Sequence, residues 1–120
     1  MKGTLCAAVL LVVVAAPPSQ GRGKSAAFSR VQISAREFNF SLSRQTIRAG
    51  QTVLELVNFG QDPHDLRLRR VGGKRVYRLA TTAPGERSML DFRTLPGRYI
   101  LWCSIGDHRR RGMTAVLTVK

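Results

Sequence analysis

Apolar and polar residues alternate in short runs from about residue 30 to the C-terminus of the 120-residue chain. The alternation runs over residues 31–35 and then, in the opposite register, over residues 38–42. Successive side chains of a strand point to opposite faces of the sheet, so a shift by one residue interrupts the pattern. The shift therefore predicts a β-bulge or a strand break near Arg36 and Glu37.

Turn signals follow at intervals of about 8–12 residues, a spacing typical of all-β proteins. They contain Gly, usually beside Ala or Pro, and stand at residues 49–50, 72–73, 83–85 and 95–97. Between and after them we expect strands over residues 52–59, from 64 onward, 75–79, 88–92, 98–103 and 114–119. No segment keeps a long 3.6-residue period. The pattern predicts an all-β Greek-key sandwich or barrel of about seven to eight strands.

The N-terminal segment has a different pattern of residues. Lys2 precedes an apolar run over residues 5–16, which is shorter than the roughly 20 residues that a membrane-spanning helix needs. This arrangement predicts a secretory signal peptide over residues 1–21, with an uncleaved anchor as the alternative. Residues 22–29 then form a linker, and residues 30–120 form one domain. We expect this domain to be secreted or periplasmic, or to lie at the extracellular face of the membrane.

Four side chains that can bind a metal follow a recognisable spacing. Cys103, His108 and Met113 form a Cys-x₄-His-x₄-Met motif, and His64 lies upstream of it. One thiolate, two imidazoles and one thioether are the ligand set of blue-copper electron-transfer sites. Structural zinc sites use paired Cys and His ligands without Met, so the spacing favours copper. Each residue alone also has an ordinary interpretation, as a buried Cys or Met or a solvated His.

The cysteine count supports a metal role. The chain has two cysteines, and removal of residues 1–21 leaves only Cys103. No internal disulfide is then possible, and an unprotected thiol is a liability in an oxidising compartment. Binding to a metal would protect the thiol. A single cysteine also excludes a binuclear copper site that requires two thiolates.

Two stretches of the chain resemble the cupredoxins, the plastocyanin and azurin family. PGRYILWC (residues 96–103) with MTAVLTV (113–119) is similar to the C-terminal motif of that family, and NFGQDPHDL (58–66) is similar to the loop of its first histidine. The resemblance covers about residues 30–120. It implies a cupredoxin-like sandwich in which one type 1 copper is bound by His64, Cys103, His108 and Met113.

The chain also departs from the family pattern. Gly106 and Asp107 stand where many relatives have Pro-Gly, and Asp65 replaces the Asn that follows the first histidine in plastocyanin and azurin. By the family pattern, the side chain of residue 65 meets Ser104 and ties the two ligand loops together. Contacts of this kind orient metal ligands. The alternative for Asp65 is a solvated loop carboxylate.

The chain is strongly basic, with a formal net charge of +13. Such a balance favours an anionic partner. We expect a redox protein with an acidic docking face, or a partner at an anionic membrane surface. Secretion and the lack of a basic stripe with interleaved aromatics argue against nucleic acid. Arg109, Arg110 and Arg111 directly follow His108, where cupredoxins commonly pass electrons, and are the candidate docking residues. The alternative is a solvated loop, with the arginine content reflecting general solubility.

These observations predict a secreted, monomeric blue-copper electron-transfer protein that is not an enzyme. With both histidines assigned to the metal, no Ser-His-acid set and no second copper site can be built. One alternative is a periplasmic or extracellular copper carrier or chaperone without a redox role. Another is a cationic binding module that holds no metal.

Overall fold

The computed structural model describes residues 3, 12–16 and 27–120 of the chain. The strands are β1 (Ser29–Arg36), β2 (Asn39–Leu42), β3 (Thr46–Ile47), β4 (Gly50–Asn58), β5 (His64–Arg70), β6 (Val76–Thr82), β7 (Arg87–Thr94), β8 (Gly97–Trp102) and β9 (Thr114–Val119). Within the described ranges, no helix is long and apolar enough to cross a membrane. The predicted signal peptide (1–21) and linker (22–29) fall largely outside the described residues.

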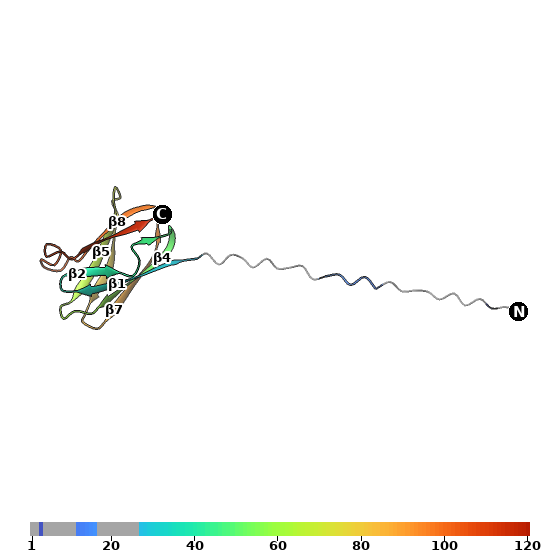
Figure 1. Ribbon diagram of the computed structural model, residues 1–120, viewed down its shortest axis with the longest axis horizontal. Helices are drawn as coiled ribbons and strands as arrows, with labels where there is room; N and C mark the ends of the chain where they lie inside the picture. The colour runs from blue at the N-terminus through green and yellow to red at the C-terminus, as the bar shows by residue number, and fades with distance from the viewer. Residues whose placement is uncertain (1–2, 4–11, 17–26) are drawn as a thin grey trace.

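The strands form two packed sheets (Figure 1). One sheet has the order β2-β1-β4-β7 and the other has the order β3-β9-β8-β5-β6. β1 pairs with β4, and β3 with β9, in parallel, while the remaining pairs are antiparallel. The predicted all-β sandwich is confirmed. The described residues form nine strands rather than seven or eight, because β3 has only two residues and is too short to produce an alternating pattern.

The core lies between the sheets and follows the alternation of the sequence. On β1, Val31, Ile33 and Ala35 are fully buried, while the residues between them face outward. The interruption predicted near Arg36 is a turn at residues 37–38 that reverses the chain into β2. Buried apolar residues from each of the other eight strands complete the core. Burial of each large apolar side chain contributes about 1.5–3 kcal/mol to the free energy of unfolding.

The candidate metal-binding residues lie where strands end. His64 is the first residue of β5, and Cys103 directly follows β8. The loop of residues 103–113 between β8 and β9 projects at the end of the sandwich away from the C-terminus (Figure 1). Ligands on strand ends and tight loops are held by the sheets behind them, so the fold can present them with little freedom.

The β4–β5 loop is fixed from inside the protein. The fully buried Asn58 donates from Nδ2 to the carbonyl oxygens of Asp62 (2.8 Å) and Thr82 (2.9 Å). Its Oδ1 accepts from the backbone N–H of Gly60 (2.8 Å). One buried amide therefore satisfies three backbone groups in the approach to His64, as a buried polar side chain requires.

Candidate metal centre

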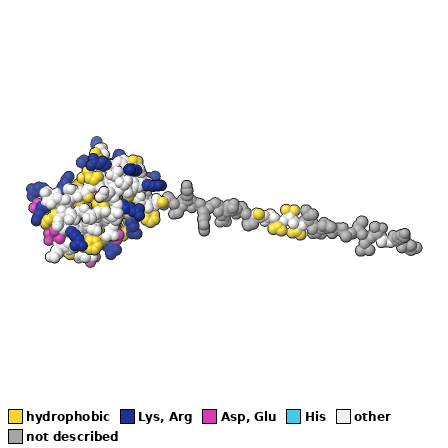
Figure 2. All heavy atoms as spheres, viewed as in Figure 1, with side chains coloured by type: hydrophobic (Ala, Val, Ile, Leu, Met, Phe, Trp, Pro, Cys, Tyr) yellow, Lys and Arg dark blue, Asp and Glu magenta, His cyan; other side chains and the backbone are white. Residues whose placement is uncertain are grey.

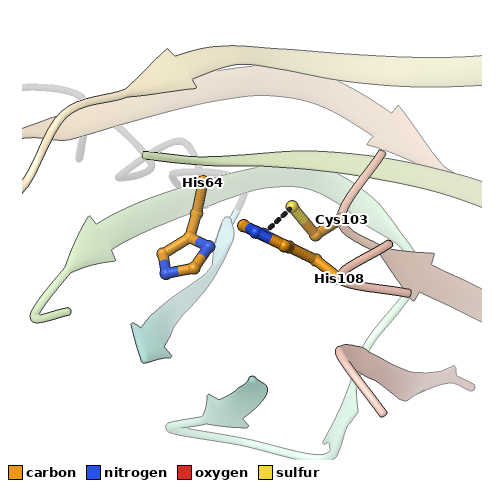
Figure 3. A group of neighbouring side chains, drawn as sticks. All are labelled: His64, Cys103 and His108. Carbon is orange, nitrogen blue, oxygen red and sulfur yellow. Dashed lines mark hydrogen bonds between the residues drawn. The ribbon is translucent and has the colours of Figure 1, made fainter. Parts of the chain in front are cut away.

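Three of the four predicted ligands converge in space. His64 and Cys103 are fully buried, and His108 is only 8% exposed. Their metal-binding atoms all lie within 4.8 Å of one another. Figure 3 shows the three side chains pointing toward a common point from the start of β5, the end of β8 and the β8–β9 loop. His64 and His108 are 44 positions apart in the sequence, yet they belong to one compact cluster.

The nitrogen atoms of the cluster have distinct surroundings. His108 Nδ1 lies 3.6 Å from Cys103 Sγ, and the two histidine rings meet edge-on with centroids 5.2 Å apart. His64 Nδ1 is buried and has no hydrogen-bond partner. A buried nitrogen left unpaired costs about 1–3 kcal/mol. A metal ion bound by Nδ1 would remove this cost, so the donor set fits a soft or borderline metal cation.

Met113 lies beside the other loop residues. Its side chain is fully buried, its carbonyl oxygen accepts from the Cys103 N–H (3.2 Å), and its own N–H donates to the His108 carbonyl oxygen (3.1 Å). These two bonds close the loop on itself. Gly112, at φ 104°, allows the turn into Met113, because this backbone conformation strains a residue with a side chain. The predicted axial ligand is therefore held next to Cys103 and His108.

Ionisation of the Cys103 thiol is unfavourable without a nearby cation. Burial raises the pKa of the Cys103 thiol above its ordinary value of 9.0. The thiolate, rather than the thiol, is the metal-binding form, and a bound cation deprotonates it. Metal binding at this site would therefore release a proton from Cys103.

A carboxylate that the sequence analysis did not identify contacts the cluster. Glu37 lies in the β1–β2 turn, and its Oε1 is 3.1 Å from His64 Nε2. Hydrogen bonds from the backbone, first from Asp62, lower the pKa of Glu37 to about 2 despite an opposing effect of burial, so the group is ionised at neutral pH. The only sequence signal for it was an acidic residue at the predicted strand break, with no motif linking it to His64.

Aromatic and acidic side chains surround the outer edge of His108. The Phe38 ring lies against the His108 ring with centroids 4.8 Å apart, and the Arg111 guanidinium lies 3.6 Å from the Phe38 ring centroid. Asp62 Oδ2 is 4.0 Å from His108 Nε2, beyond hydrogen-bonding distance. At 8% exposure, His108 is the least buried of the three clustered residues.

Asp65 joins the two ligand segments. The side chain is buried, its Oδ1 accepts from the Ser104 N–H (2.6 Å), and its Oδ2 accepts from the Ser104 hydroxyl. Arg67 Nε donates to both Asp65 Oδ2 and Ser104 Oγ, at 3.2 Å each. A buried carboxylate needs such partners, and Arg67 offsets its charge. The residues that follow His64 and Cys103 are therefore tied to each other.

The three arginines after His108 do not form one cluster. All three are exposed, but the Arg109 guanidinium lies 4.7 Å from the centre of the Trp102 ring, while Arg111 lies over Phe38. Trp102 belongs to one sheet, and Phe38 follows a strand of the other. Cation–π contacts hold these two side chains on different aromatic rings, with Arg110 between them in sequence.

Comparison with solved structures identifies the fold. Auracyanin A from Chloroflexus aurantiacus matches with a TM-score of 0.65 at 14% identity, over 78% of this chain and 100% of that one. Auracyanin from Roseiflexus castenholzii matches at 0.62 and 16% identity, over 77% and 97%. Azurin from Methylomonas sp. strain J matches at 0.60 and 16% identity, over 77% and 98%.

The chain therefore has the cupredoxin fold, as the sequence resemblance implied. No protein-family model matches the chain, and no curated protein matches it by sequence. A multicopper oxidase also shares the fold, with a TM-score of 0.59 at 10% identity over 77% of this chain and 44% of that one.

Replacement of Asp65 by Ala should loosen the Cys103 segment. The backbone N–H of Ser104 loses its acceptor, so its hydrogen exchange should accelerate by at least tenfold, and the free energy of unfolding should fall by about 1.5–3 kcal/mol. Exchange measured by NMR and denaturant unfolding check this. Asp91→Ala, on the exposed face of β7, serves as the control. Unchanged exchange at Ser104 in Asp65→Ala would contradict the assigned contact.

Proposed function

We propose that the chain is a small blue-copper electron-transfer protein with one type 1 copper bound by His64, Cys103, His108 and Met113. The observation that carries the proposal is the convergence of two imidazoles and one thiol in a buried cluster in which His64 Nδ1 has no other partner. When bound, copper supplies a one-electron couple between Cu(II) and Cu(I). Thiolate and thioether favour Cu(I), and imidazole accepts both states.

The residues around the cluster suit this role. The β4–β5 and β8–β9 loops are fixed by Asn58 and by the Asp65–Ser104 contact. A rigid donor set needs little rearrangement when an electron arrives, and a buried site excludes water. His108 reaches closest to the surface and would be the exit for the electron. We further propose that the domain is secreted or periplasmic, where metal binding protects its one remaining thiol.

The alternative is a copper carrier or chaperone with the same ligands and no redox role. An electron-transfer protein should be reduced and reoxidised repeatedly without loss of metal, whereas a carrier should release copper to an acceptor. Cyclic voltammetry with copper analysis after each cycle separates the two. Oxidase activity would need further copper ligands, and the chain contains only two histidines.

Copper loading should give one copper per chain and an intense visible thiolate-to-copper absorption band. Cys103→Ser should abolish the band, because Cys103 is the only cysteine in the domain. Absorption spectra and metal analysis check this on residues 22–120, once with Cys103 and once with the Cys103→Ser substitution. A Cys103→Ser protein that remains intensely coloured would refute the ligand assignment.

Met113 should tune the reduction potential. Met113→Leu should keep copper and colour but raise the potential, since the weak axial donor is lost; Met113→Gln should lower it. Voltammetry of both variants beside Met89→Leu, an exposed methionine on β7, gives the comparison. Equal potentials in all of these proteins would mean that Met113 is only a core residue.

We also propose that Arg109, Arg110 and Arg111 steer an acidic redox partner, or one at an anionic membrane surface, toward the edge of His108. Figure 2 shows Lys and Arg side chains scattered over the visible face of the sandwich, with few acidic ones. Positive charge is thus spread over the surface. We assign the steering of a partner to the three arginines at the rim of the site. Charge at a rim changes the association rate more than the affinity.

Replacement of all three arginines by Gln should flatten the salt dependence of electron transfer while leaving the copper spectrum nearly unchanged. Screening confines the field to about 8 Å at 0.15 M salt, so the parent rate should fall as salt rises. Stopped-flow reduction by an anionic redox protein, measured against ionic strength, tests this. Arg69→Gln/Arg78→Gln/Arg98→Gln, on β5, β6 and β8, is the matched control. Equal salt slopes in both triple variants would refute the assignment.

A further inference from the structure

The Glu37 carboxylate bridges from the β1–β2 turn to the loop that carries His64. A single oxygen, Oε1, accepts from the backbone N–H groups of Gln61 (2.7 Å) and Asp62 (2.8 Å) and lies 3.1 Å from His64 Nε2. The side chain of Glu37 is 29% exposed, whereas that of His64 is fully buried. A partly exposed carboxylate thus contacts a fully buried imidazole.

The chain leaves room for this carboxylate at Gly60. A Cβ atom at position 60 would lie 2.2 Å from Glu37 Oε1 and 2.7 Å from Cδ, closer than atoms can approach. Gly60 has no positive φ that would itself require glycine. The missing side chain therefore serves the approach of Glu37, and any side chain at position 60 must displace the carboxylate.

The hydrogen bond determines which nitrogen of His64 carries hydrogen. An ionised carboxylate can only accept, so Nε2 must donate to Glu37, and in the neutral ring Nδ1 then keeps its lone pair. That lone pair is the one with no partner inside the protein. A carboxylate on the outer nitrogen also raises the basicity of a metal-binding imidazole. His108 lacks such a bond, since its Nε2 is 4.0 Å from the exposed Asp62.

We propose that Glu37 is the positioning residue of the centre: it selects the Nδ1-binding tautomer of His64 and stabilises the oxidised state of the bound copper. The inference rests on the proposed copper site. The expected change in the reduction potential follows from charge, because reduction of Cu(II) to Cu(I) would remove one positive charge near a fixed anion. A negative group that contacts a metal-binding imidazole would favour the more positive state and so lower the reduction potential.

A purely structural role predicts different results. If Glu37 only clamps the loop through Gln61 and Asp62, its removal should affect stability without altering the tautomer or the redox equilibrium of a folded protein. Glu37→Gln separates the two roles. The amide oxygen of Gln can still accept from the same backbone groups and from His64 Nε2, but the negative charge is gone.

The first experiment compares the parent, Glu37→Gln and the exposed Glu86→Gln as a matched loss of charge elsewhere. In Glu37→Gln we expect the Cu(I)/Cu(II) equilibrium to shift toward Cu(I) by about tenfold, equivalent to about 59 mV for a one-electron couple. Glu86→Gln should shift much less. Equal potentials for Glu37→Gln and Glu86→Gln would overturn the proposal.

The second experiment does not depend on copper. In the metal-free protein, ¹⁵N NMR should show His64 with hydrogen on Nε2 in the parent and in Glu37→Gln, and a mixture of tautomers in Glu37→Ala. Zn²⁺ affinity, measured by chelator competition, should fall about 10–100-fold in Glu37→Ala. Gly60→Ala keeps the charge but displaces it, and should reproduce both effects even if Glu37→Ala folds poorly.

The two readouts separate this inference from the proposed function. If Gly60→Ala keeps the parent tautomer and the parent Zn²⁺ affinity, the positioning role is refuted. If the parent gives no visible copper band while Gly60→Ala still alters the tautomer and lowers Zn²⁺ affinity, the blue-copper function fails but Glu37 retains its role in positioning His64.

Discussion

The burial of one thiol and two imidazoles in a single cluster sets the main physical requirement on this protein. Polar atoms in the interior must be paired, and His64 Nδ1 is not. Among the described residues, no other fully buried side-chain nitrogen or oxygen lacks a hydrogen-bond partner. The cluster is therefore preorganised for a ligand rather than for packing, and a metal ion is the ligand that accepts two nitrogens and a sulfur together.

Three connections from three parts of the chain hold the donors in place. Asn58 fixes the loop before His64, Asp65 ties the residue after His64 to the residue after Cys103, and Met113 closes the last loop through backbone bonds. Each of these connections consists of only a few hydrogen bonds. Each one limits the movement of a ligand side chain, so the geometry is a property of the two sheets and not of a flexible loop.

The two histidines of the cluster are not equivalent. His64 is fully buried and hydrogen-bonded to an anion, whereas His108 lies near the surface against Phe38. Under the proposed function, His64 would hold the metal in a fixed position and His108 would face the redox partner. The charged residues follow the same division. Glu37 contacts His64 and Arg67 pairs with Asp65, whereas Arg109 and Arg111 are exposed and lie over aromatic rings.

The fold class and three clustered residues of the candidate site could be predicted from the sequence. Period-two alternation identifies strands because each strand buries one face, and the strand break near Arg36 followed from the same rule. The Cys-x₄-His-x₄-Met spacing was readable because its three residues share one loop, and His64 is the only other histidine of the chain. The family resemblance added the Asp65–Ser104 contact. The two-residue strand β3 is too short to leave a period, so the sequence could not reveal it.

The contacts between distant segments could not be predicted from the sequence, because they depend on how the two sheets pack. Glu37 is 27 residues from His64 and belongs to the other sheet's turn, and no spacing rule links the two. The reason for Gly60 is equally invisible in sequence, since it depends on a carboxylate that arrives from elsewhere in the fold. The adjacent Arg109 and Arg111 look like one charged patch in sequence, yet their side chains lie on different aromatic rings. These contacts depend on side-chain direction and on packing across the two sheets, and not on the order of residues along the chain.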